Sequence, residues 1–131
     1  MANIFHAQLL TPNGPLFEGN VTAVHVPGIE GNFEILFNHA PIVSTLDIGK
    51  ILIKKEDNKE LAYAVSGGFV EMSNNTLTIL AEKAEESSGI DMDEARKARD
   101  EAKNRLKEKP LDRKEAERDL AVAENRLKIA E

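Results

Sequence analysis

The spacing of hydrophobic residues changes once along the chain, close to Gly89. Up to about residue 86, hydrophobic side chains alternate with polar ones in short runs rich in β-branched residues. In TLTIL, for example, Leu77 and Ile79 fall on one face and the threonines on the other. Because successive side chains of a strand point to opposite faces, this alternation predicts strands with one buried and one solvent-exposed face.

Turn signals separate these runs. All eight glycines and four of the five prolines lie within residues 1–90. Asn74-Asn75 suits a two-residue hairpin turn, because asparagine tolerates positive φ angles. Gly67-Gly68 is interpreted as a tight bend or bulge between two strands. The spacing of about 8–12 residues per strand predicts an antiparallel sandwich or barrel. The runs are IFHAQLL, VTAVHVP, KILIKK, LAYAVSG, FVEMS and TLTILAE.

The stretch from Pro27 to Pro41, PGIEGNFEILFNHAP, does not fit this pattern. It begins and ends with turn-forming residues and carries hydrophobic side chains between them. We interpret it as a long connection with hydrophobic tips, and therefore as a surface suited to docking a partner.

Beyond Gly89 the residues favour helices. No glycine follows, Pro110 is the only proline, and alanine, glutamate, lysine, arginine and leucine dominate. Asp91 and Glu94 form a D-x-x-E capping box. This predicts a helix from about Met92 to Glu108, whose hydrophobic face is formed by Ala95, Ala98, Ala102 and Leu106.

A second helix is predicted after Pro110, where Asp112 and Glu115 form another capping box. A connection of about four residues favours an antiparallel helical hairpin. Because alanine buries little surface, we expect the two helices to hold together weakly, and to dock, extend or open according to what they meet. The hydrophobic face of this helix contains Ala116, Leu120, Ala123, Leu127 and Ala130.

These patterns predict a mixed fold, β then α. An N-terminal antiparallel β-sandwich is expected over residues 1–86 and a C-terminal antiparallel two-helix hairpin over residues 87–131, with a linker near residues 86–91. The charges divide in the same way. Residues 1–90 hold 5 basic and 11 acidic side chains, whereas residues 91–131 hold 12 of each.

The composition excludes several classes of function. A net charge of −6 argues against binding the phosphate backbone of a nucleic acid, which requires a basic surface. The absence of cysteine excludes disulfides, thiol catalysis and cysteine-based zinc sites. No run of about 18 apolar residues could span a membrane, and the first residues lack the features of a signal peptide. We expect a cytosolic protein, or one peripheral to a cytosolic face.

No set of residues in the sequence points to catalysis. His6, His25 and His39 have no metal-binding spacing, and no serine lies in a G-x-S-x-G motif. The interpretation of His39 stays open between a loop histidine bonded to local backbone and a contact in a docking surface. We therefore expect no catalytic residue, no metal site and no cofactor.

Four segments in order resemble the epsilon subunit of F-type ATP synthases, which is called delta in mitochondria. They are LTPNGPLFEG, VPGIEGNFEILFNHAPIVSTLDIG, VSGGFVEMSNNTLTILAEKAE and the start of the helical part, IDMDEA. The resemblance covers nearly the whole chain. The fold that it implies, a β-sandwich followed by a helical hairpin, agrees with the fold expected from the patterns.

The resemblance implies a non-catalytic rotor subunit in the central stalk of a proton- or sodium-translocating ATP synthase. In this family the sandwich binds the gamma subunit and rests on the membrane rotor ring of c subunits. The helices lie folded against the sandwich or extend toward the alpha/beta catalytic subunits, where they inhibit ATP hydrolysis. The implied location is the cytoplasmic face of the bacterial plasma membrane, without insertion into the membrane.

The resemblance also assigns partner surfaces. Asn32 stands where many members have glutamate, and Glu34, Phe37 and Asn38 depart from the family pattern too. The ring-facing residues are Gly28, Ile29, Glu30, Gly31, Asn32 and Phe33. The gamma-facing residues are His39, Ala40, Pro41, Ile42, Val43 and Ser44. Candidate contacts with the catalytic subunits are Arg96, Arg99, Arg105 and Arg126.

Some bacterial members bind ATP at the start of the hairpin through an I/L-D-x-x-R-A pattern. Glu94, Glu101 and Val122 stand where that site has arginines. Because glutamate beside a triphosphate repels it, and each lost charge-assisted bond costs about 1.5–3 kcal/mol, we expect weak or absent ATP binding. The residues that match the site are Glu85, Ile90, Asp91, Ala95 and Arg126.

Three other functions are compatible with parts of the sequence. The first is a nucleotide-sensing module whose hairpin folds on binding ATP, and the replaced arginines weigh against it. The second is an enzyme, for which the sequence offers no polar constellation. The third is a general adaptor with a helical hairpin, which co-purification with gamma would distinguish from a stalk subunit.

Overall fold

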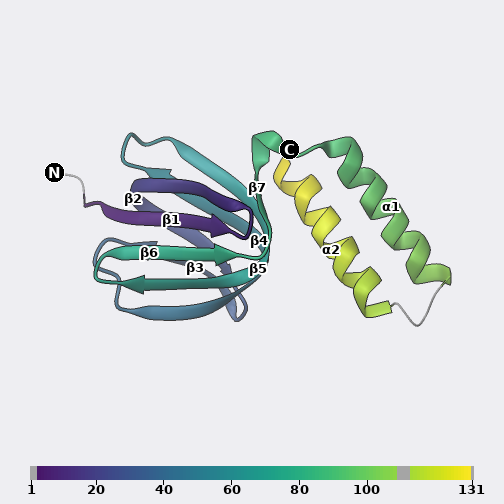
Figure 1. Cartoon of the computed structure of the whole chain (residues 1–131), viewed down its shortest axis with the longest axis horizontal. Coiled ribbons are helices and arrows are strands. Elements are labelled where there is room, and N and C mark those ends of the chain that lie inside the picture. The colour runs from purple at the N-terminus through teal and green to yellow at the C-terminus, as the bar shows by residue number, and fades with distance from the viewer. Residues whose placement is uncertain (1–2, 109–112, 131) are drawn as a thin grey trace.

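The computed structural model describes residues 3–108 and 113–130 and consists of two parts (Figure 1). This arrangement confirms the predicted fold class, a β-sandwich followed by a helical hairpin. The strands are β1 (Phe5–Thr11), β2 (Gly14–Gly28), β3 (Gly31–Leu36), β4 (Ile42–Lys55), β5 (Glu60–Ser73), β6 (Thr76–Ala81) and β7 (Ala84–Glu86). The short 3-10 helix η1 (Ser87–Gly89) leads to the helices α1 (Met92–Glu108) and α2 (Arg113–Ala130).

The strands form one sheet that closes on itself. Across the described residues, the order is β1-β6-β5-β4-β2-β3, β1 also pairs with β2, and β7 pairs with β5. The long strands change neighbour partway along, since β2 pairs first with β1 and then with β3. The β1–β6 pairing is parallel. The antiparallel sandwich that the sequence predicts therefore contains one parallel pairing, which joins the first strand to the sixth.

The hydrophobic core of the sandwich is complete without the helices. It is built from one face of each strand, as the alternation predicts: Leu77 and Ile79 are buried, whereas Thr76 and Thr78 are half-exposed. Its largest fully buried side chains all come from the strands. They are Leu9, Val21, Val24, Val26, Ile35, Ile51, Ile53, Val65, Val70, Met72, Leu77 and Ile79.

The interpretation of Pro27 to Pro41 as a long connection was wrong. Strand β2 continues to Gly28, which pairs with Gly31 at the start of β3. Gly31 has φ = +133°, so the chain reverses tightly through Ile29 and Glu30 at the tip. The stretch is therefore a β-hairpin arm. Alternation within it was hidden because β3 is short and keeps one fully buried residue, Ile35.

Gly67-Gly68 does not separate two strands, so that interpretation was also wrong. LAYAVSG and FVEMS belong to one strand, β5, and the glycines lie inside it with φ angles of +93° and +130°. They mark the place where the neighbour of β5 changes from β7 to β6. The predicted Asn74-Asn75 turn is confirmed, with φ angles of 50° and 60°.

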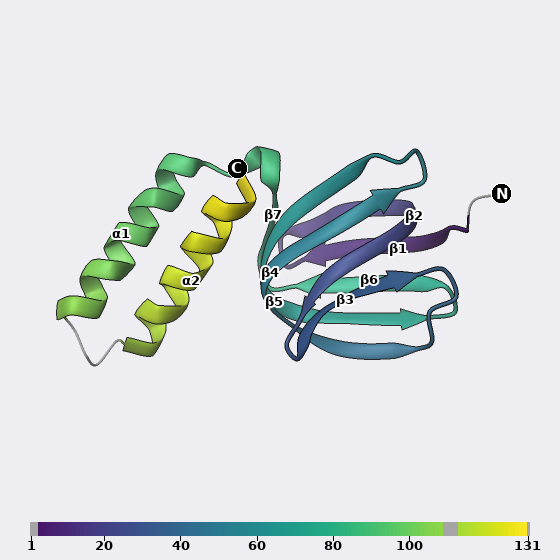
Figure 2. The same cartoon turned by 180° about the vertical axis from the view of Figure 1, so that it is seen from behind.

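The predicted bounds of the first helix are confirmed, and α2 begins at Arg113. The capping residue Asp112 lies outside the described residues. The two helices meet along four fully buried alanines, and the leucines beside them are only half-buried. Figures 1 and 2 show that α2 lies between the sandwich and α1. The alanines are Ala95, Ala102, Ala116 and Ala123.

Candidate functional site

The contact between the two parts of the molecule is made by one face of α2. Arg118, Val122 and Asn125 are spaced by four and three residues, so they share a face of the helix. Asn125 Nδ2 donates a hydrogen bond to the carbonyl oxygen of Gly49 on β4, at 2.9 Å. Arg118 Nη2 lies 3.4 Å from the carbonyl oxygen of Ser66 on β5. Polar side chains therefore make part of the contact between the hairpin and the sandwich.

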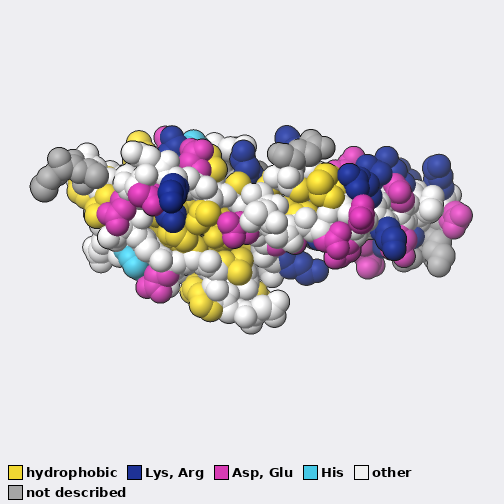
Figure 3. Space-filling model, turned by 90° about the horizontal axis from the view of Figure 1, so that it is seen from above, with side chains coloured by type: hydrophobic (Ala, Val, Ile, Leu, Met, Phe, Trp, Pro, Cys, Tyr) yellow, Lys and Arg dark blue, Asp and Glu magenta, His cyan; other side chains and the backbone are white. Residues whose placement is uncertain are grey.

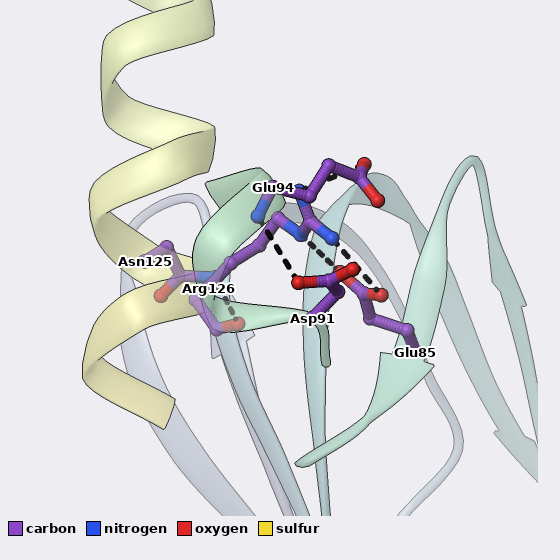
Figure 4. A network of polar contacts seen from close by, with 6 residues as sticks. Glu85, Asp91, Glu94, Asn125 and Arg126 are labelled. Atoms are coloured by element: carbon purple, nitrogen blue, oxygen red, sulfur yellow. Dashed lines mark hydrogen bonds and ion pairs between the residues drawn. The ribbon is translucent and has the colours of Figure 1, made fainter. Parts of the chain in front are cut away.

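Arg126, at the end of this face, ties three elements together (Figure 4). Its Nε and Nη2 donate to the two carboxylate oxygens of Glu85 on β7, the second at 3.4 Å. Its Nη1 lies 3.5 Å from Oε1 of Glu94 on α1. The side chain of Arg126 is only 16% exposed, while the side chains of Glu85 and Glu94 are 36% and 67% exposed. One partly buried cation thus holds a carboxylate from the sandwich and another from α1.

The surroundings of Arg126 stabilise its charged form. Burial lowers the pKa of the guanidinium, but the hydrogen bonds and negative charges of Glu85 and Glu94 act in the opposite direction and prevail, so its pKa is raised. Arginine is charged at all accessible pH values in any case. The consequence is that Arg126 stays cationic inside the junction and depends on the two carboxylates for compensation.

Glu94 has a second role at the start of α1. Its backbone N–H donates to Oδ1 of Asp91 at 3.1 Å, which confirms the half of the predicted capping box that Asp91 supplies. The carboxylate of Glu94 reaches toward Arg126 (Figure 4). The first turn of α1 is therefore fixed both by its cap and by an ion pair to α2.

A cleft of about 360 Å³ lies at this junction, between β5, β7 and α2. Of the five residues that the sequence assigns to a nucleotide site, Glu85 and Arg126 line it, whereas Ala95 is buried between the helices. Asp91 caps α1, and Ile90 is buried beside it. The charged side chains that line the cleft are Lys83, Arg126, Glu82, Glu85 and Glu94. Carboxylates outnumber cations there, which disfavours a polyanion.

The residues assigned to the rotor ring form the tip and sides of the β2–β3 hairpin. Ile29 is 60% exposed at the tip, next to the exposed Glu30, Gly31 and Asn32. Gly28 is buried, and Phe33 packs against the core. The tip presents Ile29 and Glu30, while Gly28 and Phe33 support it from below.

The residues assigned to gamma run from the end of the β3–β4 connection into β4. His39 is half-buried, and its Nδ1 lies 2.8 Å from the carbonyl oxygen of Ala40, the local backbone contact expected of a loop histidine. Val43 is 68% exposed on β4, whereas Ile42 packs against the core. The remaining three residues are Ala40, Pro41 and Ser44, of which the first two are exposed.

Sequence reasoning missed an exposed hydrophobic row beside Val43. Phe69 on β5 pairs with Leu80 on β6, and Leu80 pairs with Leu10 on β1. Phe69 and Leu80 are both exposed. Val43 lies on the same outer face, because it pairs with Glu71, two residues from Phe69. The signal was present in FVEMS, where Phe69 occupies a position that the alternation assigns to the solvent face.

The arginines assigned to catalytic subunits have partners within the chain. Arg96 donates to Asp93 at 2.9 Å, and Arg99 to Asp100 at 3.1 Å. Arg105 crosses from α1 to α2 and donates to Asp119 at 2.7 Å. Figure 3 shows acidic and basic side chains interspersed over the helical part. In the folded position Arg105 therefore joins the two helices, whereas Arg96 and Arg99 pair within α1.

The α2 docking residues Arg118, Val122 and Asn125 were not predicted from the sequence. Their common helical face was visible in the spacing, but their sheet partners lie far away along the chain.

Among residues 3–108 and 113–130, no group of three acidic or histidine side chains could hold a metal ion. No helix within that part of the chain is long and apolar enough to cross a membrane.

Two family models match the chain in succession. Residues 4–87 match the β-sandwich domain of the ATP synthase delta/epsilon chain, and residues 88–131 match its long α-helix domain. Among curated proteins, the ATP synthase epsilon chain of Halalkalibacterium halodurans is 44% identical over 128 residues, covering 95% of this chain and 96% of the relative. That of Shouchella clausii is 42% identical over 130 residues, covering 99% and 96%.

The fold is also found in a solved ATP synthase. A chain of the Euglena gracilis mitochondrial ATP synthase, in a structure of its OSCP/F1/c-ring, superposes with a TM-score of 0.84 at 25% identity. The match covers 95% of this chain and 79% of that one. The two family models match this chain in the same order as its two parts, and the alignments with these two curated relatives cover 96% of each. The chain therefore belongs to the delta/epsilon chain family of the F-type ATP synthase, as a non-catalytic subunit of the central stalk.

Proposed function

We propose that this chain couples the gamma subunit to the rotor ring of c subunits and restrains ATP hydrolysis with its C-terminal helices. The observation that carries the proposal is the division of the molecule into two parts with separate interiors. The core cluster of the sandwich contains only strand residues, while the helices pack on one another through alanines. The hairpin can therefore leave the sandwich without taking any residue out of the sandwich core.

The sandwich offers two separate surfaces for its partners. The tip with Ile29 and Glu30 is the proposed contact with the rotor ring, because it projects an exposed hydrophobic side chain from a rigid hairpin. The outer face with Val43, Phe69 and Leu80 is the proposed contact with gamma, because exposed hydrophobic side chains gather there. A subunit held at both surfaces would turn with both partners, on the cytoplasmic face of the bacterial plasma membrane.

The helices supply the proposed restraint on hydrolysis. Once the hairpin leaves the sandwich, cationic side chains of α1, such as the exposed Arg96 and the half-buried Arg99, become able to exchange their local partners for acidic groups of the alpha/beta subunits. Exposed ion pairs within one helix contribute little, so this exchange costs little. The folded hairpin is then the permissive position, and the released hairpin is the inhibitory one.

The test adds this chain to a catalytic complex that lacks its own epsilon subunit, either at full length or without residues 88–131. The full-length chain should lower the rate of ATP hydrolysis, and the shortened one should bind without lowering it. Equal rates with the two forms would refute the inhibitory role. Substitutions at Ile29 and at Val43 should separate the two docking surfaces, the first weakening attachment to the ring and the second attachment to gamma.

A second candidate function is nucleotide sensing, which the cleft at the junction of the two parts favours. A ligand bound there would contact α2 and the sandwich at once and would stabilise the folded hairpin. The excess of carboxylates weighs against ATP, so ATP is at most a weak ligand. Millimolar ATP should leave the melting temperature unchanged. A micromolar dissociation constant for ATP, measured by calorimetry, would contradict this expectation and would support a nucleotide sensor.

A further inference from the structure

We infer that Arg126, Glu85 and Glu94 form a self-contained latch, in which the chain supplies the anionic partners that hold the folded hairpin on the sandwich. The inference rests on the proposed function in one respect, namely that release of the hairpin is the regulated step. It adds that the folded position needs no bound ligand, and that the ion-pair cluster sets how readily the hairpin is released.

The geometry of the guanidinium supports this role. Nε and Nη2 of Arg126 are directed at the two oxygens of Glu85, and Nη1 is directed at Glu94 (Figure 4). All three nitrogens of the fork therefore meet carboxylates of the same chain. A side chain that already has two acidic partners leaves little attraction for an external phosphate or carboxylate.

The positions of the three residues in the fold also support their role in holding the hairpin on the sandwich. Glu85 belongs to β7, which pairs with β5 of the sandwich, while Glu94 lies in the first turn of α1. Arg126 lies on α2, so one side chain joins the sandwich to both helices. Two other residues of α2 that make polar contacts with the sandwich, Arg118 and Asn125, make them without α1. Opening the hairpin must separate Arg126 from Glu85.

The burial of Arg126 makes its partners decisive. The side chain of Arg126 is only 16% exposed in the folded position, so its charge is partly removed from water. Without carboxylates it would be an uncompensated buried charge, which is strongly unfavourable. Glu85 therefore contributes more than Glu94 to the stability of the docked hairpin, because Glu94 is mostly exposed and screened by solvent. Removal of either carboxylate should favour release of the hairpin from the sandwich. The effect should be larger for Glu85 than for Glu94.

The test is amide hydrogen exchange of α2 in the isolated full-length chain. Arg126→Gln should speed exchange of the α2 amides by about tenfold or more, Glu85→Gln by somewhat less, and Glu94→Gln by a few fold. The amides of β6 should exchange as in the wild type in every variant. The matched control is Arg113→Gln, which removes an exposed arginine of the same helix whose partner is Glu117. This control should leave the exchange rates of the α2 amides unchanged.

Several results would overturn the latch. Equal α2 exchange in Arg126→Gln and Arg113→Gln would show that the cluster does not hold the hairpin. If Arg126→Gln fails to fold, Glu94→Gln decides, since Glu94 is a surface side chain, and wild-type exchange in that variant would refute the joint latch. A slowing of wild-type α2 exchange by millimolar Mg-ATP would show that an external anion is needed.

The same variants separate the latch from the proposed function. Faster α2 exchange in Arg126→Gln together with an unchanged rate of ATP hydrolysis in the complex would keep the latch and refute the regulatory role. Faster exchange with stronger inhibition would support both. Unchanged exchange would refute the latch, whatever the complex does.

Discussion

Gly68 on β5 lies against the main chain of Leu80 on β6, so closely that a Cβ atom at position 68 would collide with the Leu80 carbonyl oxygen. Gly68 also has φ = +130°, a region that residues with side chains rarely adopt. Two separate constraints therefore require glycine at the point where β5 changes its neighbour from β7 to β6.

Replacing Gly68 by alanine should destabilise the sandwich, because both the φ strain and the collision with β6 raise the free energy of the folded state. The φ strain costs about 1–3 kcal/mol, and the collision with the Leu80 main chain adds about 1–3 kcal/mol because β6 must move. Gly14→Ala is a matched control, since Gly14 has φ = +122° but open space around it. Urea unfolding of both variants measures the difference. A Gly68→Ala variant as stable as Gly14→Ala would show that β6 adjusts freely.

The ion pair that joins the two helices should contribute measurably to the stability of the hairpin. Arg105 Nη1 donates to Asp119 Oδ2 at 2.7 Å, and the arginine is half-buried. We expect a coupling energy of about 0.5–1.5 kcal/mol between Arg105→Gln and Asp119→Asn in a double-mutant cycle. The measurement is urea unfolding followed by helical circular dichroism.

The control for that cycle is the exposed pair Arg113 and Glu117, which lies four residues apart within α2. Its coupling should stay below about 0.5 kcal/mol, because solvent screens both groups. Equal coupling in the two cycles would indicate that the bond between the helices contributes nothing beyond a surface pair.

The features that the sequence predicted correctly depend on local rules. The bounds of α1 follow from the cap at Asp91 and from helix-forming residues, and the Asn74-Asn75 turn follows from the tolerance of asparagine for positive φ. The parallel β1–β6 pairing, and the continuity of β5 through Gly67-Gly68, depend on strands that are distant in sequence. No local rule specifies such neighbours, so both were missed.

The site illustrates the same limit. Considered along the sequence, Glu94 completes a capping box with Asp91 and stands where it would repel a phosphate. In the fold it lies 3.5 Å from Arg126, which is otherwise held by Glu85, so the same charge becomes a stabilising partner. The sequence reveals which charges are present near the start of the hairpin. It does not reveal which of them meet, because that depends on how α2 docks between α1 and the sandwich.

The stability of the sandwich should fall at alkaline pH because of Tyr63. Burial, and secondly the negative charge of Glu86, raise the pKa of this tyrosine above its ordinary value of 10.0. Since the pKa is higher in the folded state, the stabilisation is complete below about pH 10 and is lost as pH rises through the folded-state pKa. Tyr63→Phe should remove this part of the pH dependence.

Tyr63 is the single tyrosine of a chain without tryptophan, so the absorbance of tyrosinate reports its titration directly. The midpoint should lie above that of the urea-unfolded chain, and Glu86→Gln should lower it. A folded chain that titrates at the same pH as the unfolded one would contradict the assigned environment. Comparison with Tyr63→Phe isolates the contribution of the tyrosine to the pH dependence of stability.

A larger residue in place of one of the buried alanines between α1 and α2 should push the two helices apart. Ala123 on α2 is fully buried in the hairpin, so Ala123→Leu inserts three carbon atoms where the helices are in close contact. We expect a loss of about 1–3 kcal/mol in the stability of the hairpin, because the helices must move apart. Ala121→Leu is the matched control, since Ala121 is exposed on the same helix and should change stability by less than about 0.5 kcal/mol. Urea unfolding followed by helical circular dichroism compares the two. If Ala123→Leu proves as stable as Ala121→Leu, the helices are packed loosely enough to accept a larger residue, and the close alanine contact is not what holds them.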